Sequence, residues 1–399
     1  MRMNKFNAIL LLPVLFFLSG CTSNKQTKEG LPTIDVRRNY PEKRVCLTDI
    51  AYVEFLYLCS DNDDFLFQGT ISSITENKVV VFDWSSGSIL FFSRDGKPKS
   101  RFNRVGQGPE EHTHSVQLVY DEAAGELFVA NVGAGLPIIQ VYSSIGEHKR
   151  TIRLPEGTFL NGRLISFDAY SLFFYDGSMT GAIVRGEPDL SVEDFVVPFY
   201  RISKATGKAL DYIRLPLTPV SLEINLEGRR IPTAGVTTLI KSLEGVLLSN
   251  GRNDTVFLFG YDRMLTPVLY KTPSLTSLNP VVFLNGLIDR GSFQFFRTVV
   301  VRPGEEFPAV FPSRYFVRNK RTGEIFRQRF FLSDYQGKEF VINPRGFGSI
   351  YEGGYVFELD LGELKEAYRE NRLGGKLKEL VTTLDEYEGN NVFMLLHFK

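Results

Sequence analysis

Residues 79–109 of this chain read VVVFDWSSGSILFFSRDGKPKSRFNRVGQGP, and the rest of the chain repeats their pattern. Two apolar runs, at 79–83 and 89–92, are rich in the β-branched and aromatic residues that favour buried strands. Asp95-Gly96 is a hairpin signal, because glycine accepts positive φ without a Cβ clash. The stretch therefore predicts strands joined by short turns, followed by a glycine- and proline-containing connector at 104–109.

Similar units recur about every 50–60 residues, as a repeat architecture requires. The turn residues that mark this spacing are Gly96, Gly146, Gly207, Asp262 and Gly323. Unequal copies of one strand-rich unit predict an all-β fold, a six-bladed β-propeller. Its expected blades are residues 67–102, 116–154, 162–215, 236–270, 293–332, and a sixth from about 334 onward.

Length and composition are consistent with one large β domain. The chain has 399 residues, of which 43% are hydrophobic and 13% aromatic, and an all-β architecture can hold this length in a single domain. Its 46 basic and 46 acidic residues balance. Because nucleic-acid binding calls for a basic excess, we expect no nucleic-acid partner.

The N-terminus has the pattern of a secretion signal. Arg2 and Lys5 precede an apolar run at 9–18, which is too short to span a bilayer comfortably. Leu-Ser-Gly-Cys at 18–21 resembles a bacterial lipobox, so we expect a lipoprotein signal peptide at 1–20 and acyl chains on Cys21 that anchor the protein to a membrane. The alternative is an ordinary signal peptide with an incidental cysteine. The expected organisation is a lipidated tether at 21–45 and a propeller domain at 46–399.

The end of the chain departs from the strand pattern. Leucines and other apolar residues spaced three or four apart across 361–384 predict an amphipathic helical segment, which Gly374-Gly375 divides into two short helices. Residues 391–398 then predict a final strand. It could pair with strands from the N-terminal part of the mature chain and close the ring, which would remove an exposed sheet edge.

Three short motifs resemble those of a family of six-bladed β-propeller lipoproteins from Bacteroidetes, related to the NHL and TolB-like propellers. RFNRVGQGPEEH at 101–112 is similar to the family hallmark, an aromatic residue and Arg followed by G-x-G-P-G-E-Y, with Glu110 and His112 in place of Gly and Tyr. NDTVF at 253–257 and NNVF at 390–393 resemble two further strands of that family. The family has no established common activity, so the resemblance implies the fold and leaves the function open.

The resemblance also bears on location within the cell envelope. Thr22 stands where an Asp tends to retain lipoproteins in the inner membrane, and the acidic cluster typical of surface export in Bacteroidetes is missing from the tether. We therefore expect the outer membrane, facing the periplasm, with surface exposure as the alternative.

Two histidines at the blade junction are candidate metal ligands. His112 and His114 would face the same side of a strand, and Glu110 or Glu111 could supply a third ligand. The alternative is a polar loop. The preceding connector could also cradle a phosphate with its backbone N–H groups, although no helix pattern follows it to add an anion site.

Aspartates at strand ends are the remaining site candidates. Asp83, Asp168, Asp176 and Asp254 stand where propellers often place channel-lining residues, and paired carboxylates there could do acid–base work on a sugar. Strand-end aspartate is also an ordinary turn former. The ligand-binding candidates are Arg104, Asp83, Asp176 and Asp254.

Two cysteines other than Cys21 are present, Cys46 and Cys59. Outside the cytosol they could form a disulfide, but buried free thiols fit their apolar surroundings equally well. The acidic turn at 61–64 resembles a calcium loop in composition, yet it lacks the glycine and distal Glu of an EF-hand.

Two classes of function follow. The leading hypothesis is a non-enzymatic scaffold that binds an envelope protein, a carbohydrate or a peptide on a propeller face. The competing hypothesis is a hydrolase that uses the central channel, either a metal-dependent enzyme of the lactonase type, with Ca²⁺ as the candidate cofactor, or a carbohydrate-active enzyme. The sequence has no G-x-S-x-G, H-E-x-x-H or Walker A pattern. Three or more metal-ligating groups converging on the channel would favour the enzyme.

Overall fold

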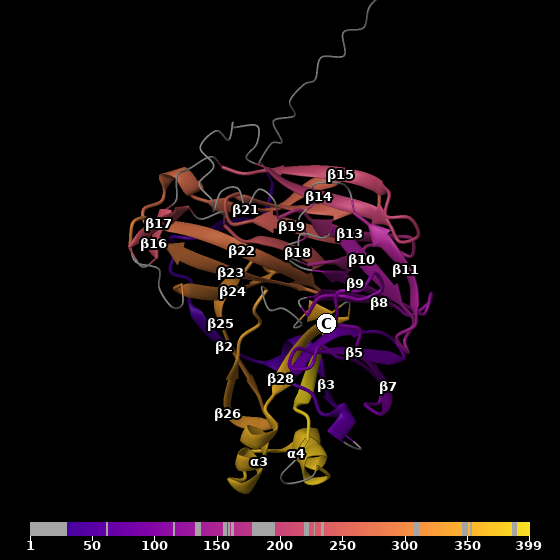
Figure 1. The fold of residues 1–399 in the computed structure, drawn as a ribbon. Coiled ribbons are helices and arrows are strands. Elements are labelled where there is room, and N and C mark those ends of the chain that lie inside the picture. The colour runs from indigo at the N-terminus through magenta and orange to yellow at the C-terminus, as the bar shows by residue number, and fades with distance from the viewer. Residues whose placement is uncertain are drawn as a thin grey trace, which may run out of the picture.

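In the computed structural model, six successive antiparallel sheets are arranged around a central channel (Figure 1). Each sheet is one blade, and its strands run outward from the channel in chain order, except that the outer strand of blade 6 comes from the N-terminal part of the chain. The structure describes residues 30–60, 63–114, 116–131, 137–154, 158, 160, 163–177, 196–218, 223–226, 228–232, 235–305, 311–344, 350–351, 353–384 and 389–399. The expected six-bladed all-β architecture is confirmed.

The first three blades follow the expected boundaries closely. Blade 1 contains β4 (Gly69–Ile74), β5 (Lys78–Asp83), β6 (Ile89–Ser93) and β7 (Pro98–Phe102). Blade 2 contains β8 (Val116–Asp121), β9 (Glu126–Asn131), β10 (Ile138–Tyr142) and β11 (His148–Arg153). Blade 3 contains β12 (Ile165–Ser166), β13 (Ser171–Tyr175), β14 (Val196–Ser203) and β15 (Ala209–Pro216).

The last three blades include two boundaries that the sequence misplaced, the starts of blades 5 and 6. Blade 4 contains β18 (Thr237–Lys241), β19 (Gly245–Asn250), β20 (Thr255–Gly260) and β21 (Leu265–Thr272). Blade 5 contains β22 (Val281–Arg290), β23 (Phe293–Val301), β24 (Ser313–Asn319) and β25 (Ile325–Leu332). Its first strand precedes the expected start at residue 293. Blade 6 contains β27 (Ile350–Tyr351), β28 (Gly354–Leu359), β29 (Val392–Phe398) and β3 (Ala51–Tyr57).

Two shorter elements lie outside this scheme. The strand β26 (Tyr335–Phe340) pairs with β25, so residues near 334 extend blade 5 and do not begin blade 6 as expected. A hairpin of β16 (Glu223–Leu226) and β17 (Arg229–Pro232) follows blade 3 in the sequence, and the carbonyl oxygen of Glu223 accepts a 2.8 Å hydrogen bond from the N–H of Gly304, just after β23 of blade 5. Two 3₁₀ turns, η1 (Asp63–Phe65) and η3 (Leu275–Ser277), complete the connections.

The two ends of the chain close the ring together. The final strand β29 pairs antiparallel with β3, in a register that places Val392 opposite Tyr57 and Phe398 opposite Ala51. The expected closure by an N-terminal strand is therefore confirmed. This pairing brings together segments more than 300 residues apart in the sequence, and it covers the sheet edge that β29 would otherwise expose.

The part of the chain before β3 does not form a simple tether to residue 45. The strand β1 (Thr33–Asp35) pairs in parallel with β21 of blade 4, and β2 (Glu42–Cys46) pairs in parallel with β25 of blade 5. The expected tether boundary at residue 45 was wrong. The two short strands pair with the free backbone N–H and C=O groups at the outer edges of blades 4 and 5, and such pairing requires no alternating apolar sequence. The four-residue helix α1 (Leu47–Ile50) then leads into β3.

The expected pair of short helices is confirmed as α3 (Leu361–Arg369) and α4 (Gly375–Thr382), which lie together at the lower edge of the view (Figure 1). Asp360 caps α3 by accepting a 2.8 Å hydrogen bond from the backbone N–H of Glu363. The apolar residues that face the propeller are Leu361, Leu364, Leu377 and Val381. Among the described residues, no helix has the length and apolar character needed to cross a membrane.

The core lies between neighbouring sheets. Phe91 of blade 1 packs against Tyr120 of blade 2 with 5.1 Å between ring centroids, and Phe173 of blade 3 packs against Phe259 of blade 4 at 5.6 Å. Both faces of the inner strands are thus buried, which explains their continuous apolar runs.

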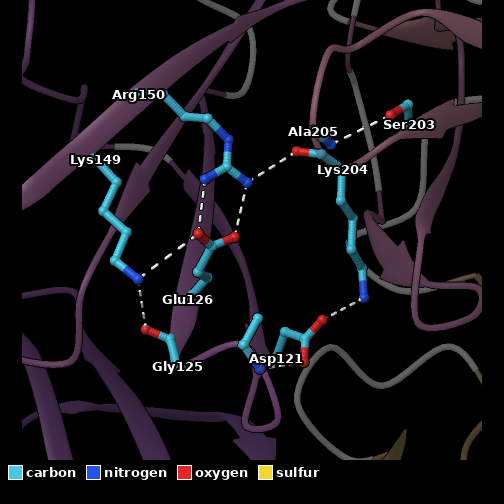
Figure 2. Close-up of polar contacts among 9 residues, drawn as sticks. Asp121, Gly125, Glu126, Lys149, Arg150, Ser203, Lys204 and Ala205 are labelled. Carbon is cyan, nitrogen blue, oxygen red and sulfur yellow. Dashed lines mark hydrogen bonds and ion pairs between the residues drawn. The ribbon is translucent and has the colours of Figure 1, made fainter.

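Ion pairs add to the contact between blades 2 and 3 (Figure 2). Glu126 of β9 forms a bidentate pair with Arg150 of β11, both bonds being 2.7 Å. Arg150 also donates to the carbonyl oxygen of Lys204 in blade 3, at 3.0 Å. The ammonium of Lys204 in turn lies 2.6 Å from the carboxylate of Asp121 in blade 2, and both side chains are largely buried. The network therefore crosses the junction twice.

Candidate functional site

A cavity of about 150 Å³ occupies the channel at the centre of the ring. The inner strands β4, β8 and β12 supply most of its wall, and the ends of β18 and β27 complete it. Residues from five different blades therefore meet at one place, although each contributes only a short local segment of sequence. This convergence makes the channel the candidate functional site.

Two cationic side chains line the cavity, Arg163 just before β12 and Lys241 at the end of β18. Burial lowers the pKa of Arg163 to about 10, which still leaves the guanidinium charged at neutral pH. The uncharged polar residues of the wall include Thr70, Ser73 and Gln117. The described residues that line the cavity include no Asp or Glu, so its chemistry is that of hydroxyl and amide groups around two positive charges.

Tyr351 connects the cavity wall to the outer strands of blade 6. Its hydroxyl lies 3.1 Å from Nδ1 of His397, whose Nε2 lies 3.0 Å from the carboxylate of Glu54. Arg94 of blade 1 pairs with the same carboxylate at 2.7 Å. Burial raises the pKa of Tyr351, so its hydroxyl stays neutral and offers one donor and one acceptor at the channel.

The carboxylate of Glu54 is held in its charged form. Burial raises the pKa of Glu54, but hydrogen bonds from Arg94 and His397 outweigh that effect, and the net shift is downward. The arrangement therefore positions the Tyr351 ring through charge-assisted hydrogen bonds that begin at the junction of blades 6 and 1.

The aspartates predicted from the sequence are outside the cavity lining. Asp83 closes the turn after β5: it accepts hydrogen bonds from the hydroxyls of Ser85 and Ser86 at 2.7 and 2.6 Å. Burial raises the pKa of Asp83, but these hydroxyls and two backbone N–H groups outweigh it and lower the pKa overall. Asp168 makes the same kind of turn with Ser171, at 2.7 Å. For these two residues the turn-former alternative describes the observed contacts.

The other two aspartates also have structural surroundings. Asp254 forms a 2.7 Å ion pair with the fully buried Lys271 and accepts from the backbone N–H of Leu275. Asp176 is buried and forms a short β-bridge with Leu160. The structure therefore distributes the four aspartates over blades 1, 3 and 4, with Asp168 and Asp176 both in blade 3, and none of them lines the cavity.

The connector that carries the family hallmark is fastened to blade 2. Arg104 donates to the carbonyl oxygen of Gly146 at 3.0 Å, and Tyr142 donates to that of Glu110 at 2.7 Å. The two connector glycines wrap the side chain of Glu111, whose carboxylate accepts from the N–H of Gly108 at 2.6 Å. Of the anion cradle that the sequence left as an alternative, the structure shows one N–H group, that of Gly108, and it is bonded to a carboxylate of the chain itself.

The histidine pair does not converge. His112 is fully buried, with Nδ1 2.8 Å from the carbonyl oxygen of Thr113, and burial lowers its pKa. His114 instead lies 2.6 Å from the carbonyl oxygen of Trp84. Across the described part of the chain, no three His, Cys, Asp or Glu side chains are grouped as metal ligands would be.

The two cysteines both carry thiols in the structure and are partly buried. Cys46 Sγ lies 3.1 Å from the hydroxyl of Thr48. Of the two alternatives left by the sequence, the structure therefore shows separate thiols. Cys21 and the predicted signal peptide, together with two residues of the acidic turn at 61–64, lie outside the described residues.

Comparison with known proteins supports the architecture. A family model described as 6-bladed beta-propeller matches residues 22–181. This chain is a six-bladed β-propeller. The recognition of such a propeller family from the sequence motifs is thereby confirmed, whereas lipidation and the relation to NHL and TolB-like propellers remain predictions.

Two solved structures from Bacteroides resemble this propeller. One is a Bacteroides fragilis protein described as exported, with 15% sequence identity and a TM-score of 0.58 over 92% of this chain and 99% of that one. The other is a member of the DUF4221 family from Bacteroides vulgatus, with 13% identity and a TM-score of 0.49 over 88% and 97% of the two chains. At such identity the first likeness shows the fold alone. No curated protein matches the sequence.

No local sequence signal marks the cavity residues. Arg163, Lys241 and Tyr351 each stand next to a strand end, as many surface residues do. Their common feature is that they precede or follow an inner strand of a blade, and the short inner strands β12 and β27 have only two residues each. Correct prediction of every inner strand would have placed these three residues at the channel.

Proposed function

We propose that this propeller is a lipid-anchored, non-enzymatic binding protein of the cell envelope, and that it takes a small anionic ligand into its central channel. The observation that carries the proposal is the cavity at the ring centre, where Arg163 and Lys241 line a wall of otherwise neutral groups. Two cationic side chains that converge on one small cavity favour an anion there.

The size and donor set of the cavity limit the ligand. Its volume of about 150 Å³ is below the roughly 300–1,000 Å³ typical of pockets for drug-sized molecules. A guanidinium presents a planar fork that matches carboxylate and phosphate oxygens, and an ammonium adds a point charge. Hydroxyls of Thr70 and Ser73 and the amide of Gln117 could orient the remaining oxygens. These properties favour phosphate, sulfate or a small organic acid.

Placement in the envelope rests on the N-terminal sequence. The lipobox-like segment before Cys21 supports export and acylation, and the Bacteroides fragilis relative described as exported supports export in a propeller of the same fold. Thr22 favours the outer membrane, with the propeller in the periplasm.

Calorimetric titration of the mature protein with inorganic phosphate, sulfate and citrate tests the proposal. We expect saturable binding of at least one anion, weakened at least tenfold by Arg163→Met or by Lys241→Met, since each change removes a charge-assisted contact. Lys208→Met, in an exposed turn of blade 3, is the matched control and should bind normally. Thermal unfolding without ligand checks that each variant folds. Absence of saturable binding, or equal affinity in all variants, would refute the channel as an anion site.

A further inference from the structure

Among the described residues, five of the eleven exposed large apolar side chains lie in turns at one end of the blades. In every antiparallel blade, the turns that follow the first and third strands lie at the same end, and we call the surface that they form the odd-turn face. Ile145 of blade 2, Tyr170 of blade 3, and Leu243, Tyr261 and Met264 of blade 4 all lie in such turns, with exposed fractions between 45% and 81%.

In the part of the chain that the structure describes, turns at the opposite end of the blades carry two such residues. Trp84 follows the second strand of blade 1, and Val105 follows its fourth strand, so both belong to that face; they are 53% and 37% exposed. The exposed apolar side chains of the odd-turn face also come from three consecutive blades. An exposed patch of this kind marks an interaction surface more often than an isolated apolar residue does.

The turns that carry the patch are held in place. Tyr261 packs on Phe167 of the neighbouring blade, with 5.2 Å between ring centroids. The carbonyl oxygen of Tyr170 accepts a 2.9 Å hydrogen bond from the backbone N–H of Lys204. Since these contacts fix the backbone, the apolar side chains are presented to the surroundings at little further cost in conformational entropy.

The N-terminal chain approaches the propeller on this side. The strand β1 is parallel to β21, and the carbonyl oxygen of Pro32 accepts from the N–H of Tyr270 at 2.9 Å. Because the strands are parallel, the N-terminal end of β1 is directed toward the end of β21 at Leu265, directly after the turn that contains Met264. Cys21 precedes Pro32 by 11 residues, and an extended chain of that length spans at most about 40 Å.

From these observations we propose that the odd-turn face of blades 2 to 4 rests on the lipid bilayer, with Tyr170, Leu243 and Met264 in the interfacial layer. Tyrosine suits this layer because its ring is apolar and its hydroxyl can remain hydrated. A single apolar patch would bind only weakly, whereas acyl chains on Cys21 would hold the patch at the surface. The orientation depends on the proposed lipid anchor, but contact between the face and lipid does not.

The test uses the mature chain, residues 21–399, carrying Cys21→Ser, so that acyl chains play no part. It is mixed with vesicles of phosphatidylethanolamine and phosphatidylglycerol that contain brominated lipids. Trp84 is the only tryptophan of the chain and lies on the opposite face, so its fluorescence should not be quenched. In a Trp84→Phe, Leu243→Trp variant the new tryptophan should shift to the blue and be quenched.

Vesicle sedimentation supplies a second measurement. Leu243→Glu with Met264→Glu should lower the partition coefficient by about tenfold or more, because two apolar contacts are replaced by charges. Val105→Glu on the opposite face is the matched control and should leave it unchanged. Equal quenching at positions 84 and 243, or no effect of the two glutamates, would overturn the proposal. If the vesicle results are as expected and radiolabelled palmitate is not incorporated in cells, the lipid anchor fails and the lipid-contacting face stands.

Discussion

The α-carbon of Gly96 lies so close to the carbonyl oxygen of Tyr57 that an added Cβ would overlap it. Gly96 belongs to the last turn of blade 1, and Tyr57 ends β3, the outer strand of blade 6. The carbonyl of Gly96 also accepts a 2.9 Å hydrogen bond from the N–H of Cys59. The glycine of the equivalent turn in blade 2, Gly146, contacts Phe102 of blade 1. The repeated glycine therefore serves contact between blades as well as the turn.

Gly96→Ala should destabilise the protein by roughly 2–4 kcal/mol, because the new methyl group forces the junction of blades 6 and 1 apart and φ is +87°. Chemical denaturation measures the change. Gly323→Ala is the matched control: it stands in the equivalent turn of blade 5 with φ of +73° and has no neighbour within 4 Å of the added Cβ. It should cost only about 1 kcal/mol. Equal losses in the two variants would show that contact between the blades contributes nothing.

Asn390→Ala should weaken the closure of the ring by roughly 2–4 kcal/mol, since it leaves buried backbone groups without partners. The Asn390 amide donates to the carbonyl oxygens of Leu58 and Phe65 at 2.8 and 2.9 Å and accepts from the N–H of Phe67 at 3.1 Å. Asn390→Asp keeps the size and one acceptor but loses both donated bonds, so it too should destabilise. Hydrogen exchange at β3 measures the effect locally, and unchanged protection there would contradict this role.

Lys204→Met should destabilise the junction of blades 2 and 3 by about 3 kcal/mol at neutral pH, because it leaves the carboxylate of Asp121 buried and unpaired. Burial raises the pKa of Asp121, but the hydrogen bond from Lys204 and backbone N–H groups outweigh it, so the folded pKa is below the unfolded one. This stabilisation is present above the unfolded pKa, about 4, and is lost as pH falls through the folded value.

The pH dependence separates this ion pair from simple loss of packing. Urea unfolding over a range from acidic to neutral pH should show the difference between wild type and Lys204→Met shrinking below about pH 4. Lys208→Met, in the same turn but exposed, should track the wild type at every pH. A difference that is independent of pH would mean that the methylene groups of Lys204 matter and its charge does not.

We call the anion position beside the N–H of Gly108 the nest. Glu111→Ala should empty it and cost about 1–2 kcal/mol. The N–H of Gly108 then loses its 2.6 Å bond to the carboxylate. We also expect added sulfate to raise the melting temperature of this variant more than that of the wild type, because an external anion can replace the carboxylate. Glu110→Ala, with an exposed side chain, serves as the control. An identical sulfate response in all three proteins would count against the nest.

Cys21→Ser should leave the fold intact and release the protein from the membrane fraction, because acylation requires the thiol. Cell fractionation and thermal unfolding measure the two parts of this outcome. Cys46→Ser is the control, since its thiol lies at the end of β2 beside Thr48. Unchanged membrane association of the Cys21→Ser chain would contradict the lipoprotein prediction.

Much of the fold could be predicted from local sequence, and the exceptions share a cause. Strands such as Lys78–Asp83 and Ile89–Ser93 are apolar because both faces are buried, so they are visible in the sequence. The short strands β1 and β2 add to the edges of other blades by parallel backbone pairing, and their three and five residues show no alternating apolar pattern that would predict it. In blade 4 the left-handed turn residue is Arg263, with φ of +66°, and not the neighbouring Asp262 that the spacing suggested.

The candidate site could be predicted far less well. Asp83 and His112 attracted attention because their residue types carry chemistry, but one closes a turn and the other is buried beside Tyr142. Arg163 and Lys241 reach the cavity because two blades, separated by more than 70 residues of sequence, face the same axis. The sequence of each repeat predicts the strands of one blade. Which side chains line the shared channel depends on how all the blades are arranged around it.

The sequence by itself determined the unit of the fold, its number of copies, the paired helices near the end and the strand that closes the ring. These features follow from local alternation, turn residues and spacing, which act over a few residues. Only the tertiary structure decided which edges accept the N-terminal strands, which glycines touch the neighbouring blade, and which side chains line the channel. Those outcomes depend on contacts between segments far apart in the chain, where short-range preferences carry no information about the partner.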